Sequence, residues 1–126
     1  TSDPEPDPGL YSVSINEAIK SGKPSLIAFV TPSFCKTATC GPQLEVIKML
    51  RTSYKNQAHL IHVEIYSNPQ KISSGIETAS LSPTVEEWNL PSEPWVFVID
   101  SGGRISGKFE GYASFEEISE QLQQVI

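Results

Sequence analysis

Apolar and polar positions along the chain follow two different periods. Three short runs are rich in apolar side chains and predict buried β-strands; they span residues 25–30, 60–66 and 95–99. A fourth segment, residues 104–109, alternates polar and apolar side chains, as an edge strand with one face in solvent does. The pattern therefore predicts four strands, and the first run is apolar enough to be covered on both faces.

Four other segments carry the signature of helices. Residues 14–17 and 114–117 are capping boxes, in which a serine is followed three positions later by a glutamate. Apolar side chains recur at helical spacing over residues 42–54. Ser82-Pro83 followed by acidic residues starts a short helix that ends before Pro91.

The order of these elements is α-β-α-β-α-β-β-α, which predicts an α/β fold. A helical crossover joins the first two strands, so we expect them to be parallel. The turn at residues 100–103 joins the last two as an antiparallel hairpin. Residues 67–81 show no clean period and are predicted to form a loop or irregular insertion.

The first ten residues differ in composition from the rest of the chain. Pro4, Pro6 and Pro8 alternate with acidic residues, which predicts an extended, flexible segment over residues 1–10. The remaining residues, 11–126, suffice for one domain with one core. Because such a start is typical of a tether, it favours an extracytoplasmic protein of a bacterial envelope: periplasmic, secreted or membrane-tethered. A cytoplasmic location is the alternative.

The charge of the chain narrows the classes of partner. The formal net charge is −6, and lysine and arginine do not cluster anywhere in the sequence. A surface that binds phosphate backbones needs such clusters, so the sequence argues against a nucleic-acid partner. No apolar run approaches the roughly 20 residues that span a bilayer as a helix.

The two cysteines carry the main chemical hypothesis. Cys35 and Cys40 lie close together between the strand at 25–30 and the helix that follows it. Two sulfurs this near can exchange a disulfide. The positive end of the helix favours a thiolate at Cys40, whereas the order along the chain makes Cys35 the attacking sulfur and Cys40 the resolving one. The sequence leaves this choice open.

This order of elements, with a cysteine pair before the first crossover helix, resembles the thioredoxin family over residues 11–126. Local matches support the resemblance: Lys23-Pro24 leads into a core strand, Cys40-Gly41-Pro42 begins like the family's Cys-Gly-Pro-Cys motif, and Pro94 precedes a strand as the family's cis-proline does. The resemblance implies a three-layer sandwich in which helices flank a central mixed sheet of about four strands.

The chain also departs from the family pattern. Gln43 replaces the second motif cysteine, and Cys35 supplies a sulfur upstream instead, which gives a Cys-x4-Cys spacing. The family's buried acid aligns with Ala28, which cannot carry a proton. The usual tryptophan before the first cysteine is Phe34 or Thr39, depending on which cysteine is aligned.

The resemblance implies a thiol–disulfide oxidoreductase that acts through Cys35 and Cys40. It would be a monomer without a cofactor, exchanging disulfides with a protein substrate and reset by a redox recycling partner. The expected substrate contacts are Phe34, Glu93, Pro94 and Trp95, and the supporting helix N-terminus is Gly41 and Pro42. A cis Pro94 would expose the Glu93 backbone to an extended substrate. The alternatives are a trans proline that starts the strand and a Trp95 that belongs to the core.

Two other functions fit the same cysteines. One is a structural or interaction module whose disulfide only braces the loop. The other is a soft-metal protein, such as a copper-delivery protein, that adds His59 or His62 to the two sulfurs. Both histidines fall at the second strand, whereas copper-delivery proteins on this fold use a histidine late in the chain. We therefore predict no metal site.

Overall fold

The computed structural model describes residues 1–32, 39–66, 81–90 and 94–126. Phe34, Cys35 and Glu93 lie outside these ranges, as does most of the loop predicted at 67–81. The described elements, in chain order, are η1 (Pro8–Leu10), α1 (Ile15–Lys20), β1 (Ser25–Val30), α2 (Cys40–Tyr54), β2 (His59–Glu64), α3 (Pro83–Trp88), β3 (Trp95–Ile99), β4 (Ile105–Glu110) and α4 (Phe115–Gln123).

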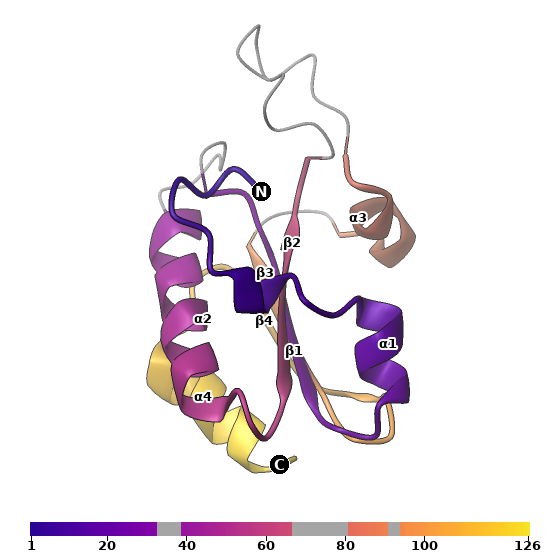
Figure 1. Ribbon diagram of the computed structural model, residues 1–126. Helices are drawn as coiled ribbons and strands as arrows, with labels where there is room; N and C mark the ends of the chain where they lie inside the picture. Colours follow the sequence, from indigo (N-terminus) through magenta and orange to yellow (C-terminus); the bar gives the residue numbers. More distant parts are fainter. Residues whose placement is uncertain (33–38, 67–80, 91–93) are drawn as a thin grey trace, which may run out of the picture.

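The four strands form one mixed sheet in the order β2-β1-β3-β4. β1 and β2 are parallel, whereas β3 is antiparallel to both β1 and β4. This arrangement confirms the predicted α/β class, the parallel crossover and the final hairpin. α2 and α4 cover one face of the sheet, and α1 and α3 cover the other, so the molecule has three layers (Figure 1).

β1 is buried along its whole length because it lies inside the sheet and both of its faces are covered. Leu26, Ala28 and Val30 pack toward α2 and α4, while Ile27 and Phe29 pack toward α1 and α3. The second cluster contains an aromatic group in which the Phe29 ring lies 5.2 Å from that of Trp88 and 5.8 Å from that of Phe97, between ring centroids. Each such pair adds about 1 kcal/mol beyond the area that it buries.

The capping boxes at both predicted helix starts are present. In α1 the Ser14 hydroxyl accepts from the Glu17 N–H, and the Glu17 carboxylate accepts from the Ser14 N–H. Ser114 and Glu117 make the same reciprocal pair at α4. The ends of two elements differ from the prediction. α2 begins at Cys40 and not at residue 42, and β2 ends at Glu64 and not at residue 66.

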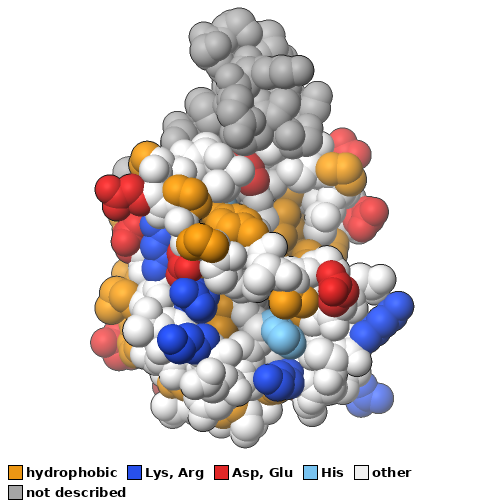
Figure 2. All heavy atoms as spheres, in the orientation of Figure 1, with side chains coloured by type: hydrophobic (Ala, Val, Ile, Leu, Met, Phe, Trp, Pro, Cys, Tyr) orange, Lys and Arg blue, Asp and Glu red, His pale blue; other side chains and the backbone are white. Residues whose placement is uncertain are grey.

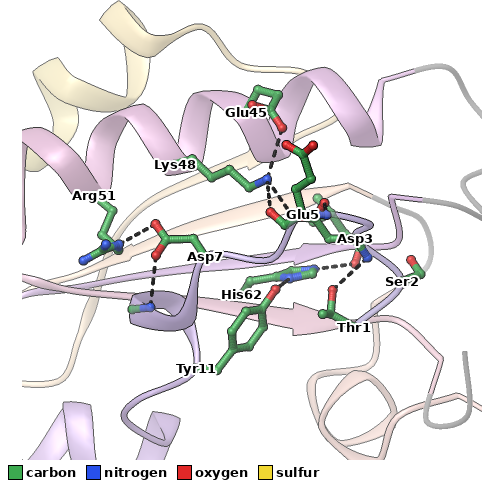
Figure 3. Close-up of polar contacts among 12 residues, drawn as sticks. Thr1, Ser2, Asp3, Glu5, Asp7, Tyr11, Glu45, Lys48, Arg51 and His62 are labelled. Carbon is green, nitrogen blue, oxygen red and sulfur yellow. Dashed lines mark hydrogen bonds and ion pairs between the residues drawn. The ribbon is translucent and has the colours of Figure 1, made fainter.

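The N-terminal segment contacts α2 and β2 (Figure 3). Asp3 and Asp7 form ion pairs with Lys48 and Arg51, at 2.7 and 2.5 Å, and Leu10 is fully buried. The hydrogen bond from Arg51 holds the pKa of Asp7 below its ordinary value. The sequence shows the acids and prolines of this segment but not these partners, which lie about 45 residues away. The flexibility predicted for residues 1–10, and the domain boundary after them, stay predictions.

Charged side chains of both signs lie on the face of the molecule shown in Figure 2. On the described part of that face, lysine and arginine side chains lie among acidic and uncharged ones. None of the helices in the described part of the chain has the length and apolar character that crossing a bilayer requires.

Candidate active site

Cys40 is the first residue of α2, and its side chain is fully buried. The sequence suggested that its sulfur faces the positive end of the helix. In the structure Thr39 is the capping residue, and Cys40 belongs to the cluster that packs between α2 and the sheet. The Cys40 sulfur is in a disulfide. Cys35, the other cysteine of the chain, lies outside the described residues, so its pairing with Cys40 stays a prediction.

Gly41 and Pro42 form the outer side of the same helical turn. Pro42 is exposed and Gly41 is half-buried, in contrast to Cys40 and Gln43 on the inner side. A Cβ atom added at Gly41 would meet nothing within 4 Å. The first turn of α2 therefore has an accessible outer side at Gly41 and Pro42, whereas Cys40 on its inner side is buried.

Pro94 lies at the end of the sheet from which β1 leads to the cysteines. The antiparallel register pairs Trp95 with Phe29, so the start of β3 adjoins the last residues of β1. Pro94 is buried, and its carbonyl accepts a hydrogen bond of 2.9 Å from the Gly111 N–H. Whether the bond before Pro94 is cis stays a prediction, because Glu93 lies outside the described residues.

Trp95 packs on the side of the sheet covered by α1 and α3. Its ring stacks on Phe97 with centroids 5.6 Å apart and planes 9° apart. Trp95 as a whole is half-buried. These contacts support the reading of Trp95 as part of the core, and its predicted contact with substrate stays a prediction.

Gln43 is a site feature that the sequence did not predict beyond its replacement of a cysteine. Its side chain is fully buried one turn after Cys40. The amide Nε2 donates to the Ala113 carbonyl at 3.2 Å, and Oε1 accepts from the Ala113 N–H at 2.7 Å. The available signal was a polar residue on the apolar face of the helix, three positions after the cysteine. Its partner is 70 residues away.

His62 is a second buried polar side chain, which the sequence suggested only as an alternative metal ligand. It lies beside Ala28 in the register of β2 and β1, on the side of the sheet that faces α2. Its Nε2 lies 2.9 Å from the Val30 carbonyl, and its Nδ1 lies 2.6 Å from the Tyr11 hydroxyl (Figure 3). A carbonyl only accepts, so Nε2 carries the proton and Nδ1 accepts from Tyr11.

Burial lowers the pKa of His62 from its ordinary value of 6.5, against the opposing effects of the Val30 carbonyl and of the carboxylates of Glu64 and Asp3. The histidine is therefore neutral at neutral pH. Both of its nitrogens are already engaged within the protein, which leaves neither one open to a metal. Among the described residues, no group of three or more potential metal ligands lies together.

Comparison with known proteins rests on structure alone. No protein-family model matches the sequence, and no curated protein sequence matches it. Solved structures do match. The exposed lipoprotein thioredoxin of Streptococcus pneumoniae strain TIGR4 aligns with a TM-score of 0.65 at 15% identity, covering 87% of this chain and 89% of that chain. The chain has a thioredoxin-like fold.

Two further structures agree with this assignment. A thiol:disulfide interchange protein of the thioredoxin family from Chlorobium tepidum TLS aligns with a TM-score of 0.63 at 15% identity, covering 90% of both chains. A thioredoxin-like protein in its oxidized form aligns with a TM-score of 0.68 at 17% identity, covering 90% of this chain and 84% of that chain. At such identities the likeness concerns the fold, and the chemistry has to be argued from this chain's own residues.

On the thioredoxin-like fold, the described site residues come from three neighbouring elements. Cys40 and Gln43 come from the first turn of α2, Pro94 precedes β3, and Ala113 follows β4. The two hydrogen bonds between Gln43 and Ala113, and the one from the Gly111 N–H to the Pro94 carbonyl, join these elements into one connected group. A hollow of about 550 Å³ lies elsewhere, lined by residues of α1, β2 and α3.

Proposed function

We propose that this protein is a thiol–disulfide oxidoreductase that exchanges disulfides with protein substrates through Cys35 and Cys40. The observation that carries the proposal is the disulfide-bonded sulfur of Cys40, held at the start of the helix that follows the central strand of a thioredoxin-like fold. A disulfide between Cys35 and Cys40 would close a short loop, so its entropic gain as a structural brace would be modest, about 2 kcal/mol. Exchange chemistry accounts better for its placement.

The burial of Cys40 assigns different roles to the two sulfurs in this proposal. A fully buried sulfur cannot be approached by a folded protein substrate, whereas it can attack a sulfur that lies next to it inside the protein. Cys35 is therefore the attacking cysteine and Cys40 the resolving one. This choice follows the order of the residues along the chain and differs from the preference for Cys40 that its place at the helix start suggested.

In the reducing direction, the Cys35 thiolate attacks one sulfur of a substrate disulfide and expels the other as a thiolate. Cys40, once deprotonated, then attacks Cys35, releases the second substrate thiolate and forms the Cys35–Cys40 disulfide. The substrate gains two electrons and two protons, and the protein loses them. A dithiol reductant resets the pair, and the same steps in reverse oxidise a substrate dithiol.

The substrate is proposed to be a protein segment in extended conformation beside Pro94. Strand addition at the Glu93 backbone would align the segment, with Phe34 and Trp95 as side-chain contacts. The working state is a monomer. The resemblance to a protein described as an exposed lipoprotein, together with the acid- and proline-rich start, supports an extracytoplasmic location.

Reduction of insulin by dithiothreitol tests this function. We expect micromolar amounts of the protein to shorten the lag before the insulin B chain precipitates. The variant that carries both Cys35→Ala and Cys40→Ala should match the reaction without protein. Equal lag times for the wild type and the double variant would contradict the proposal, provided that circular dichroism shows both to be folded.

A further inference from the structure

The loop that follows β4 is held by hydrogen bonds to other parts of the protein at both of its ends. At one end the Gly111 N–H donates to the Pro94 carbonyl at 2.9 Å, and Gly111 has a φ of +76°, which favours glycine at this position. At the other end Ala113 is buried and pairs with Gln43 through both its N–H and its carbonyl. Tyr112, between these two attachments, is 51% exposed.

The side-chain amide of Gln43 can pair with both backbone groups of Ala113. A primary amide offers one acceptor and a donor in the same plane, so it satisfies the N–H and the carbonyl of a single residue as another peptide unit would. An apolar side chain of the same length would leave both groups of Ala113 buried without a partner. Because unpaired buried groups are costly, the loop would shift to expose them to water.

Gln43 also fixes where the loop lies relative to the reacting sulfurs. Cys40 and Gln43 are three positions apart in one helix, so their side chains are neighbours on the same face. The loop is therefore held within one helical turn of Cys40, with the exposed ring of Tyr112 carried between its two attachments.

We propose that Gln43 is a positioning residue for the substrate: it holds the Gly111–Ala113 loop against the first turn of α2, so that Tyr112 contacts a protein substrate bound beside Pro94. The inference rests on the proposed disulfide exchange and adds one substrate contact and the residue that positions it. A protein substrate touches the loop as well as the sulfur, whereas a small aromatic disulfide needs the sulfur alone.

The test compares two substrates in the Gln43→Met variant. We expect the KM for insulin to rise about tenfold, while the reaction of the reduced protein with 5,5′-dithiobis(2-nitrobenzoic acid) stays within about twofold of the wild type. Gln57→Met, which alters an exposed glutamine after α2, is the matched control and should change neither value. An unchanged KM for insulin, or an equal loss with both substrates, would overturn the inference.

A second variant keeps the inference testable if Gln43→Met does not fold. Tyr112→Ala changes an exposed side chain and should raise the KM for insulin without changing the reaction with the small disulfide. In the double variant the two effects should not add, because both act through the same loop. Independent, additive effects, or no effect of Tyr112→Ala, count against it. If the wild type itself reduces no insulin, the proposed function has failed, which is a separate result.

Discussion

Replacing Cys40 with alanine should trap the protein on its substrate, and replacing Cys35 with alanine should prevent any capture. Without the buried resolving sulfur, the bond between Cys35 and the substrate has no internal thiol to break it, so mixed disulfides accumulate. Without Cys35, Cys40 is the remaining sulfur; it is fully buried in the disulfide-bonded protein, so we expect it to stay out of reach of a protein substrate. Turnover of insulin should fall to the background rate in both variants.

Non-reducing electrophoresis followed by mass spectrometry distinguishes these outcomes. The reduced Cys40→Ala variant, mixed with oxidized insulin, should give a species that contains an insulin chain and disappears on treatment with dithiothreitol. The Cys35→Ala variant, handled in the same way, is the matched control. Mixed disulfides formed through Cys40 in that control would reverse the proposed roles and restore Cys40 as the attacking sulfur.

The stability of the protein should fall as the pH drops below about 6.5, because of His62. Burial lowers its pKa in the folded protein, whereas in the unfolded chain it takes up a proton near its ordinary value of 6.5. The unfolded state therefore binds more protons between these two pKa values. The contribution of His62 to the free energy of unfolding is fully present above pH 6.5. Below that pH it falls by at most about 1.4 kcal/mol for each pH unit, down to the lowered pKa.

Urea unfolding between pH 5 and pH 7.5 measures this effect. The range stays above the acid region in which Asp7, with its lowered pKa, would begin to lose its own contribution. The His62→Gln variant stays uncharged throughout and should lose the dependence. His59→Gln, on the same strand, is the matched control and should retain it. A wild type that is equally stable at pH 5 and pH 7.5 would contradict this account of His62.

The removal of the His62 ring should also be costly at neutral pH. His62→Ala leaves a cavity at a position that is 3% exposed, and it deprives Val30 and Tyr11 of their hydrogen-bond partner. Together these losses amount to about 2–4 kcal/mol.

The elements of this fold were predictable because their signals are local. The apolar run of β1 needs only six consecutive residues to indicate a strand with two covered faces. The two capping boxes need four residues each, and the alternation of β4 marks it as an edge strand. The parallel pairing of β1 with β2 and the hairpin of β3 with β4 then followed from their connections, whereas the antiparallel pairing of β1 with β3 was not predicted.

The site was less predictable because its contacts join distant residues. The spacing of the cysteines pointed to disulfide exchange, but nothing near Cys40 in the sequence indicates what covers its sulfur. The bonds of Gln43 with Ala113 and of His62 with Tyr11 span 70 and 51 residues. No periodic pattern in the sequence indicates such a pair, so these contacts can be identified only in the folded structure.

Titration of the protein in redox buffers of defined potential tests the central claim most directly. Trapping with a thiol-alkylating reagent, followed by mass spectrometry, counts the thiols of Cys35 and Cys40 at each potential. The account predicts that both thiols appear together in one two-electron transition, with a midpoint in the range of about −120 to −270 mV found for disulfide oxidoreductases. A pair that stays oxidized below about −300 mV, as structural disulfides do, or a single thiol that appears alone, would contradict it.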